Sequence, residues 1–207
     1  MQPFTTVTGV VAPLLRDDVD TDAIIPAAFM RSLTTDPADG LFARWRYRED
    51  GREDPSFVLN DPRFRPATFL LAGRNFGCGS SRENAVWALA RFGIRAVLAL
   101  GFSDIFTENA YKNGLLPLAL PADAHARLAA AARATTLTIT VDAGQGTITM
   151  PDAAPIGFAL EPRRRARLLA GQDEIDESLV LRDDIARFRA AQAQRLPWLF
   201  DVDVTAG

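Results

Sequence analysis

The sequence predicts an α/β fold, on the evidence of three patterns. Short apolar runs alternate with longer segments of helical periodicity between residues 69 and 134. One run, Gly93 to Leu100, is almost continuously apolar, as is typical of an interior strand in a parallel sheet. Gly114 and Gly171 stand where helix C-termini are expected. We therefore expect parallel strands joined by right-handed helical crossovers.

Each element follows from its own apolar pattern. Val7 to Leu15 alternates weakly and predicts the first strand, whereas Ile24-Ile25-Pro26 predicts a short buried strand or a turn. Further strands are predicted at 69–72, 93–100, 115–118 and 156–160, with a hairpin formed by 137–141 and 147–150. Helices are predicted from about residue 80 to Phe92, and at 105–113, 121–134, 163–170 and 182–194.

Residues 27–66 are the least regular stretch, and we expect them to form a long, ordered loop on the substrate side of the molecule. Repeated Asp-Pro and Asp-Gly pairs are turn signals, and the interleaved aromatic residues are too many for a disordered linker. Long ordered loops usually carry function. The loop arginines would either meet an acidic substrate or form a solvated basic face: Arg31, Arg44, Arg46 and Arg48.

Composition excludes several classes of function. The 207 residues carry a net charge of -3, which argues against nucleic acid or an anionic membrane as the main partner. No apolar run approaches the ~20 residues that span a bilayer, and the first residues do not form a signal peptide, so we expect a cytoplasmic protein. The single cysteine allows no internal disulfide, and it cannot supply an iron–sulfur cluster or a multi-cysteine zinc site.

An aspartate-rich stretch, Arg16 to Asp22, follows the first predicted strand. Four carboxylates within six residues suggest a metal site, and their spacing resembles part of a calcium loop. The glycine and the distal glutamate of that loop are missing. A turn whose aspartates cap the next element is the simpler interpretation.

The loop Gly77-Cys78-Gly79-Ser80-Ser81-Arg82 is the strongest functional signal. It lies between a predicted strand and a predicted helix, so backbone N–H groups, the helix dipole, two hydroxyls and a guanidinium converge there. Such a point attracts an anion, and a carboxylate fits better than a phosphate because no phosphate-loop motif is present.

Two other interpretations of this loop are a helix cap and a hydrolase triad. Ser80 and Glu83 have the spacing of a capping box, which would serve only to begin a helix. A hydrolase triad would have to use His125, the only histidine, which lies in an alanine-rich helical segment and is expected at the surface. Neither interpretation explains the second serine, the arginine and the two glycines together.

Several stretches together resemble the small subunit of 3-isopropylmalate dehydratase, of the bacterial type in the aconitase superfamily. The resemblance covers nearly the whole chain in order. The motifs that carry it are Asp18-Val-Asp-Thr-Asp-Ala-Ile-Ile-Pro26, Asn75-Phe-Gly-Cys-Gly-Ser-Ser-Arg-Glu83, Phe102-Ser-Asp-Ile-Phe106 and Asn113-Gly-Leu-Leu-Pro117.

This resemblance implies a swivelling β/β/α domain, with a small central sheet flanked by helices, over residues 1–207. It implies an enzyme of leucine biosynthesis that isomerises 2-isopropylmalate and 3-isopropylmalate by dehydration and rehydration. The active site would lie between this chain and a large subunit carrying a [4Fe-4S] cluster on three cysteines, in a heterodimer or heterotetramer. The implied roles are Ser80 as catalytic base, Gly79, Ser81 and Arg82 as ligands of the substrate carboxylate, Asp20, Thr21 and Asp22 as lining residues, and Arg31 in the loop that recognises the substrate side chain.

Two positions depart from the family pattern. The family usually has Glu-His-Ala-Pro-Trp where this chain has Glu83-Asn84-Ala85-Val86-Trp87. A related hydratase for another hydroxy diacid, such as citraconate, methylmalate or dimethylmalate, stays open, and so does a non-catalytic anion-binding module.

Overall fold

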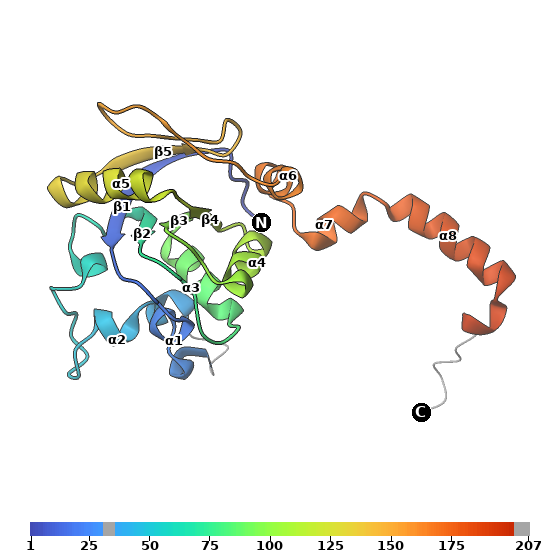
Figure 1. Ribbon diagram of the computed structural model, residues 1–207. Helices are drawn as coiled ribbons and strands as arrows, with labels where there is room; N and C mark the ends of the chain where they lie inside the picture. The colour runs from blue at the N-terminus through green and yellow to red at the C-terminus, as the bar shows by residue number, and fades with distance from the viewer. Residues whose placement is uncertain (31–35, 201–207) are drawn as a thin grey trace. The chain divides into compact units, whose positions relative to one another are not determined.

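The computed structural model describes residues 1–30 and 36–200, and it confirms the α/β class (Figure 1). Residue contacts divide the chain into two units, Met1–Gly171 and Gln172–Gly207. The expectation of one domain over residues 1–207 stays a prediction. Within the described residues, every helix falls short of the length and hydrophobicity that crossing a bilayer requires.

A mixed sheet forms the centre of the first unit. In the described residues it has seven strands in the order β4-β3-β2-β1-β5-β6-β7. Strands β1 to β4 pair in parallel, and β1 also pairs antiparallel with β5, so the first strand joins the two halves of the sheet. The strands are β1 (Thr6–Leu14), β2 (Ala67–Ala72), β3 (Ala96–Ala99), β4 (Leu116–Ala119), β5 (Thr138–Asp142), β6 (Thr147–Thr149) and β7 (Ile156–Gly157).

Alternation along the strands separates two hydrophobic cores. Leu70 and Ala72 of β2 belong to a core with α3 (Glu83–Phe92) and α4 (Asp104–Lys112), whereas Phe69 and Leu71 belong to a core with α5 (Ala122–Ala134). Figure 1 shows α3 and α4 on one side of the parallel strands and α5 on the other. The helices of this unit are α1 (Thr21–Ile24), α2 (Ala43–Arg46), α3 (Glu83–Phe92), α4 (Asp104–Lys112), α5 (Ala122–Ala134) and α6 (Pro162–Ala170), with short 3₁₀ turns η1 (Ala27–Met30), η2 (Pro37–Gly40) and η3 (Val58–Asn60).

The loop after Pro26 is ordered over its described part, as predicted. Phe42 stacks on Trp45 with 5.6 Å between ring centroids, and the Arg16 guanidinium lies 4.5 Å from the centroid of the Trp45 ring. Arg46 belongs neither to a solvated face nor to a substrate site, because it is buried and donates to the Ala38 carbonyl at 3.2 Å. Its role is to hold the loop together.

One expectation from the sequence was wrong, and one pair of alternatives is decided. Of the strand or turn expected at Ile24-Ile25-Pro26, the strand is excluded, because Ile24 ends the one-turn helix α1, which the Asp20 side chain caps by accepting from the Ala23 N–H at 2.6 Å. His125 is buried, not at the surface, because it lies on the inner side of α5, where its Nε2 hydrogen-bonds the Ala72 carbonyl at 2.7 Å. The histidine thereby pairs a carbonyl at the end of β2.

The described part of the second unit contains α7 (Glu174–Leu179), α8 (Arg182–Arg195) and the 3₁₀ turn η4 (Pro197–Leu199). Helix α8 was predicted and α7 was not. A capping box between Asp173 and Asp176 begins α7, so a local hydrogen-bond pattern replaces the apolar periodicity that the sequence prediction relied on.

Candidate functional site

The candidate site lies where β1 and β2 end. These strands are parallel neighbours, with Leu14 opposite Ala72, so the segments 15–22 and 73–82 leave the sheet at the same edge. The carboxyl edge of parallel strands is the usual place for a ligand in open α/β sheets. The topology therefore brings together two stretches that the sequence analysis had singled out separately.

Backbone hydrogen bonds join the two segments. The Gly77 N–H donates to the Val19 carbonyl at 2.7 Å, and the Thr21 N–H donates to the Cys78 carbonyl at 2.9 Å. The Thr21 hydroxyl donates to the Ser80 carbonyl at 2.9 Å. Thr21 is buried, and its two hydrogen bonds hold the backbone of the loop that carries Ser80.

The two glycines of the loop both adopt positive φ, at 75° for Gly77 and 87° for Gly79. At Gly77 a side chain is excluded by packing as well, because a Cβ there would lie 2.3 Å from Cγ of Phe106. Phe106 stacks on Phe102, and the Ser103 hydroxyl donates to the Gly77 carbonyl at 2.6 Å. Gly77 thus packs against Phe106 in the first turn of α4, and Phe106 in turn stacks on Phe102 just before that helix.

The capping-box interpretation was wrong. Helix α3 begins at Glu83 with Arg82 in the N-cap position and no side-chain cap bond, because the glycine loop keeps the chain extended as far as Arg82. The Glu83 carboxylate instead accepts from Nδ2 of Asn113 at 2.8 Å. The Ser80 and Ser81 side chains are therefore not used for capping, and both residues are exposed.

The backbone N–H groups next to these hydroxyls lack backbone acceptors in the described residues. Among the described residues, none of the N–H groups of residues 79–84 donates to a backbone carbonyl. They lie at the N-terminus of α3, a helix of ten residues, where the helix dipole favours negative charge. This arrangement can receive an anion such as a carboxylate.

Arg82 pairs with Asp22 across the two segments. Both guanidinium Nη atoms bind the carboxylate, with Nη2 at 3.0 Å from Oδ2. The Arg82 side chain is 18% exposed and the Asp22 side chain 41%. The hydrogen bond from Arg82, followed by the charges of Arg82 and Arg44, lowers the pKa of Asp22 below its usual 3.8. The pair fixes the arginine beside the serines.

We expect this ion pair to persist from neutral pH down to the acid range. Folding lowers the pKa of Asp22 below its usual 3.8. The contribution of the pair to the free energy of unfolding is therefore fully present above pH 3.8, and it is lost only as the pH falls through the lower pKa of the folded state. An NMR titration of the Arg82 side-chain Nε–H resonance checks this. A midpoint at or above pH 3.8 would contradict it.

Of the other aspartates, Asp20 caps the helix that follows, as the turn interpretation expects, whereas Asp17 and Asp18 bind the facing segment. Asp17 accepts from the Arg74 N–H at 2.7 Å, and Asp18 accepts from Nδ2 of Asn75 at 2.8 Å. Among the described residues, no three His, Cys, Asp or Glu side chains are grouped to hold a metal ion. The pKa of the Cys78 thiol is raised, mainly by burial and further by the charges of Asp20 and Asp18, and this disfavours the thiolate.

Sequence reasoning missed two supporting residues. Ser103 caps α4 and binds the Gly77 carbonyl, and Asn113 links Glu83 to Trp87, whose Nε1 donates to Oδ1 of Asn113 at 3.0 Å. A serine before an acidic first helical turn is a capping signal that would have identified Ser103. Nothing local to Asn113 indicates its long-range partners. Arg31, predicted to contact the substrate, lies outside the described residues.

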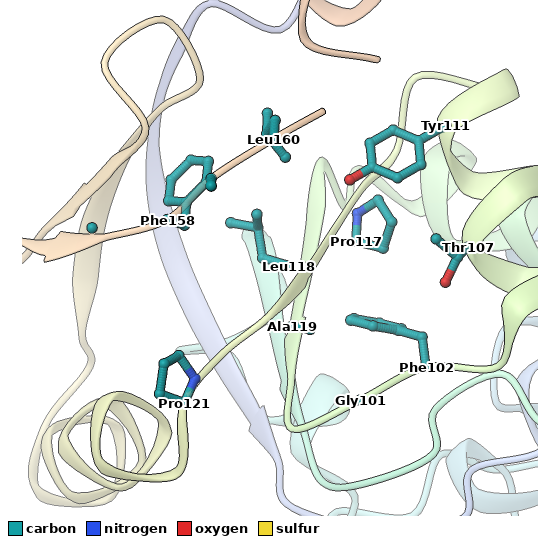
Figure 2. A pocket seen from close by; sticks show the side chains of 12 residues that line it. Gly101, Phe102, Thr107, Tyr111, Pro117, Leu118, Ala119, Pro121, Phe158 and Leu160 are labelled. Atoms are coloured by element: carbon teal, nitrogen blue, oxygen red, sulfur yellow. The ribbon is translucent and has the colours of Figure 1, made fainter. Parts of the chain in front are cut away.

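Two hollows lie outside the serine loop. A cavity of about 520 Å³ within the long loop is bordered by Pro26, Phe29, Arg44 and Arg48. A second, of about 610 Å³, lies between β4 and the segment after β7, and Figure 2 shows Phe158 and Leu160 facing Leu118 and Tyr111 across it. The lining of the second includes none of the residues that the sequence analysis assigned to the site.

Comparison with known proteins agrees with the motifs. The family model for the aconitase C-terminal domain matches residues 1–123. A 3-isopropylmalate dehydratase small subunit from Paramagnetospirillum magneticum is 47% identical over 201 residues, covering 96% of this chain and 100% of the relative. The chain belongs to the aconitase C-terminal domain family, with the small subunits of 3-isopropylmalate dehydratase.

Other members of this family agree. The small subunit from Cupriavidus necator is 49% identical over 204 residues, covering 96% of this chain and 98% of that one. A crystal structure of 3-isopropylmalate dehydratase from Methanocaldococcus jannaschii superposes with a TM-score of 0.64 at 29% identity, covering 89% of this chain and 99% of the other. The aconitase-type fold expected from the sequence is thereby confirmed.

Proposed function

We propose that this chain is the small subunit of a 3-isopropylmalate dehydratase, a hydro-lyase of leucine biosynthesis that works in the cytoplasm with a large subunit. The observation that carries the proposal is the exposed pair Ser80 and Ser81 at the N-terminus of α3, beside Arg82. The family membership supports the same reaction.

The substrate carboxylate would bind at the N-terminus of α3. The N–H groups of residues 79–84 and the Ser81 hydroxyl supply donors, and the helix dipole supplies a favourable field. Arg82 adds charge, and Asp22 holds its guanidinium in place while leaving the Nε edge of the fork for a ligand. Lysine could not reproduce this planar, doubly bonded arrangement.

Ser80 would act as the catalytic base. A serine hydroxyl is too weakly acidic to ionise near pH 7, so the alkoxide needs the same donors and guanidinium for stabilisation. The alkoxide takes the proton from the carbon next to the carboxylate, that C–H electron pair forms the new C=C bond, and the hydroxyl on the neighbouring carbon leaves. In the return direction, hydroxide adds to the carbon that lost the proton, and Ser80 gives its proton to the carbon that lost the hydroxyl, which restores the alkoxide.

The metal would belong to the partner. An iron–sulfur cluster needs several cysteine thiolates as ligands. This chain offers one partly buried cysteine, and its described residues contain no group of three metal-ligating side chains. The residues present therefore do not fit a cluster. We place a [4Fe-4S] cluster on the large subunit, in a heterodimer or heterotetramer, where it would supply Lewis acidity to the departing hydroxyl.

An assay of the reconstituted pair tests the proposal. With the large subunit from the same organism, we expect kcat/KM for 3-isopropylmalate to exceed that for the citraconate-derived hydroxy diacid by about 100-fold or more. The smaller diacid lacks two side-chain carbons, and each missing methylene in an apolar pocket costs about 10- to 200-fold. A preference for citraconate would identify a paralogue for a smaller diacid. A complex inactive on both would identify a non-catalytic module.

A further inference from the structure

Helix α4 supports the serine loop, residues 77–82, at both of its ends. At the start of the helix, the Ser103 hydroxyl donates to the Gly77 carbonyl at 2.6 Å. At the other end, the side chain of Asn113 donates to the carboxylate of Glu83, the first residue of α3. The first contact holds the backbone of the loop, whereas the second holds a charged group beside the proposed carboxylate site.

The orientation of the Asn113 amide is fixed by its neighbours. The indole Nε1–H of Trp87 can only donate, and it lies 3.0 Å from Oδ1 of Asn113, so the amide oxygen faces the indole. The NH2 group therefore faces the other way, where it donates to the Glu83 carboxylate at 2.8 Å and to the Asn109 carbonyl at 2.9 Å. An amide that is bound on both sides holds the carboxylate in one place.

A released Glu83 carboxylate would compete with a bound anion. Glu83 is exposed at the N-terminal end of α3, where the helix dipole favours negative charge. The Arg82 guanidinium and the N–H groups of residues 79–84, which donate to no backbone carbonyl in the described residues, belong to the same stretch of chain. A carboxylate tethered this closely has a high effective concentration, so it would occupy these donors unless another group held it elsewhere.

The sequence shows which donor the carboxylate would take. Ser80 and Glu83 have the spacing of a capping box, and in that motif the glutamate accepts from the backbone N–H of the serine. That N–H is one of the donors proposed above for the substrate carboxylate. In the structure the Glu83 carboxylate binds Asn113 instead, which leaves this donor to a ligand.

We propose that Asn113 is a positioning residue for substrate binding: it holds the Glu83 carboxylate against α4 and so keeps the N-terminus of α3 open to the carboxylate of the substrate. This inference rests on the proposed function in one respect, the binding of a dicarboxylate at that end of the helix. Asn113 acts through Glu83 and is not placed against the reacting atoms. Loss of the contact should therefore change the affinity for substrate and leave the chemical step nearly intact.

Exchanging donor and acceptor between the two side chains tests the proposal. In Asn113→Asp an oxygen replaces the donor nitrogen with almost no change of shape, so the two carboxylates repel each other and Glu83 is released. We expect KM for 3-isopropylmalate in the reconstituted pair to rise at least about tenfold, with kcat changed less than about threefold. Adding Glu83→Gln restores the hydrogen bond in the reverse direction and the original net charge, and KM should return to within about threefold of its original value.

The control variant is Asn109→Asp. It adds the same charge one turn earlier on α4, where the side chain forms no hydrogen bond within the described residues, and KM should change less than about twofold because such a charge is largely screened by salt. A KM that stays high after Glu83→Gln is added to Asn113→Asp would overturn the proposal, since Asn113 would then only join the two helices. If circular dichroism shows that Asn113→Asp does not fold, Asn113→Ala with and without Glu83→Gln gives the same comparison.

Binding of diacids that cannot react separates this inference from the proposed reaction. Isopropylsuccinate and methylsuccinate lack the hydroxyl group that leaves, and their Kd values for the complex with the large subunit are measured anaerobically by isothermal titration calorimetry. A Kd that rises in Asn113→Asp and recovers with Glu83→Gln supports the positioning role, whether or not the unaltered complex turns over 3-isopropylmalate. If the unaltered complex binds neither diacid, the inference is overturned, because no carboxylate then occupies that end of α3.

Discussion

Replacing Ser80 with alanine is expected to reduce turnover of the assembled enzyme by at least about 1,000-fold. The variant loses the oxygen that removes the proton, and no other side chain in the described part of the loop offers a base at the same place: the Ser81 hydroxyl is assigned to the carboxylate and Asp22 is paired with Arg82. Fold and assembly should be unchanged, because the contact that holds this residue uses its backbone carbonyl. Steady-state kinetics with saturating large subunit give the measurement.

Ser81→Ala is the matched comparison, since both residues are exposed and stand next to each other in the loop. A lost carboxylate ligand should raise KM, with kcat reduced by less than about tenfold. If Ser80→Ala instead behaves like Ser81→Ala, Ser80 is a binding residue and the assignment of the base fails.

Gly77→Ala is expected to destabilise the first unit by about 3 kcal/mol. Two costs combine: φ is 75°, and the new Cβ would lie 2.3 Å from the ring of Phe106, which is itself buried between Phe76 and Phe102. The Phe106 ring cannot move away without disturbing its contacts with Phe76 and Phe102. Urea unfolding followed by circular dichroism gives the free energy of unfolding.

Gly51→Ala separates the two costs. Gly51 has nearly the same φ, at 79°, but a Cβ there meets nothing within 4 Å. Only the backbone cost of about 1 kcal/mol should remain. Equal losses at the two positions would show that the contact with Phe106 is not what excludes a side chain from Gly77.

Elements with strong apolar patterns could be predicted from the sequence. Helix α5 lies close to its expected bounds, β3 lies within the longer apolar run that predicted it, and Gly114 has the positive φ that ends a helix. The short helices α1 and α7 could not be found this way, because an aspartate cap begins each one and neither is long enough to show a period. Hydrophobic periodicity needs several turns to become visible.

The candidate site also has parts that could be predicted from the sequence and parts that could not. The glycine loop was recognisable locally, and so was its position before a helix. The pairing of Asp22 with Arg82 was not, because 60 residues separate them and only the parallel pairing of β1 with β2 brings them together. The capping box failed for a related reason: the motif was present, but the backbone held by Thr21 and Gly77 does not enter the helix until Glu83.

The hydrogen bonds from Thr21 to Cys78 and Ser80 have a consequence for protein engineering. A chimaera that receives the serine loop of a relative without its aspartate segment would keep a Thr21 that is positioned for the carbonyl groups of the original loop. Grafts that aim to alter substrate preference should therefore transplant both segments as one cassette, even though they lie far apart in the gene.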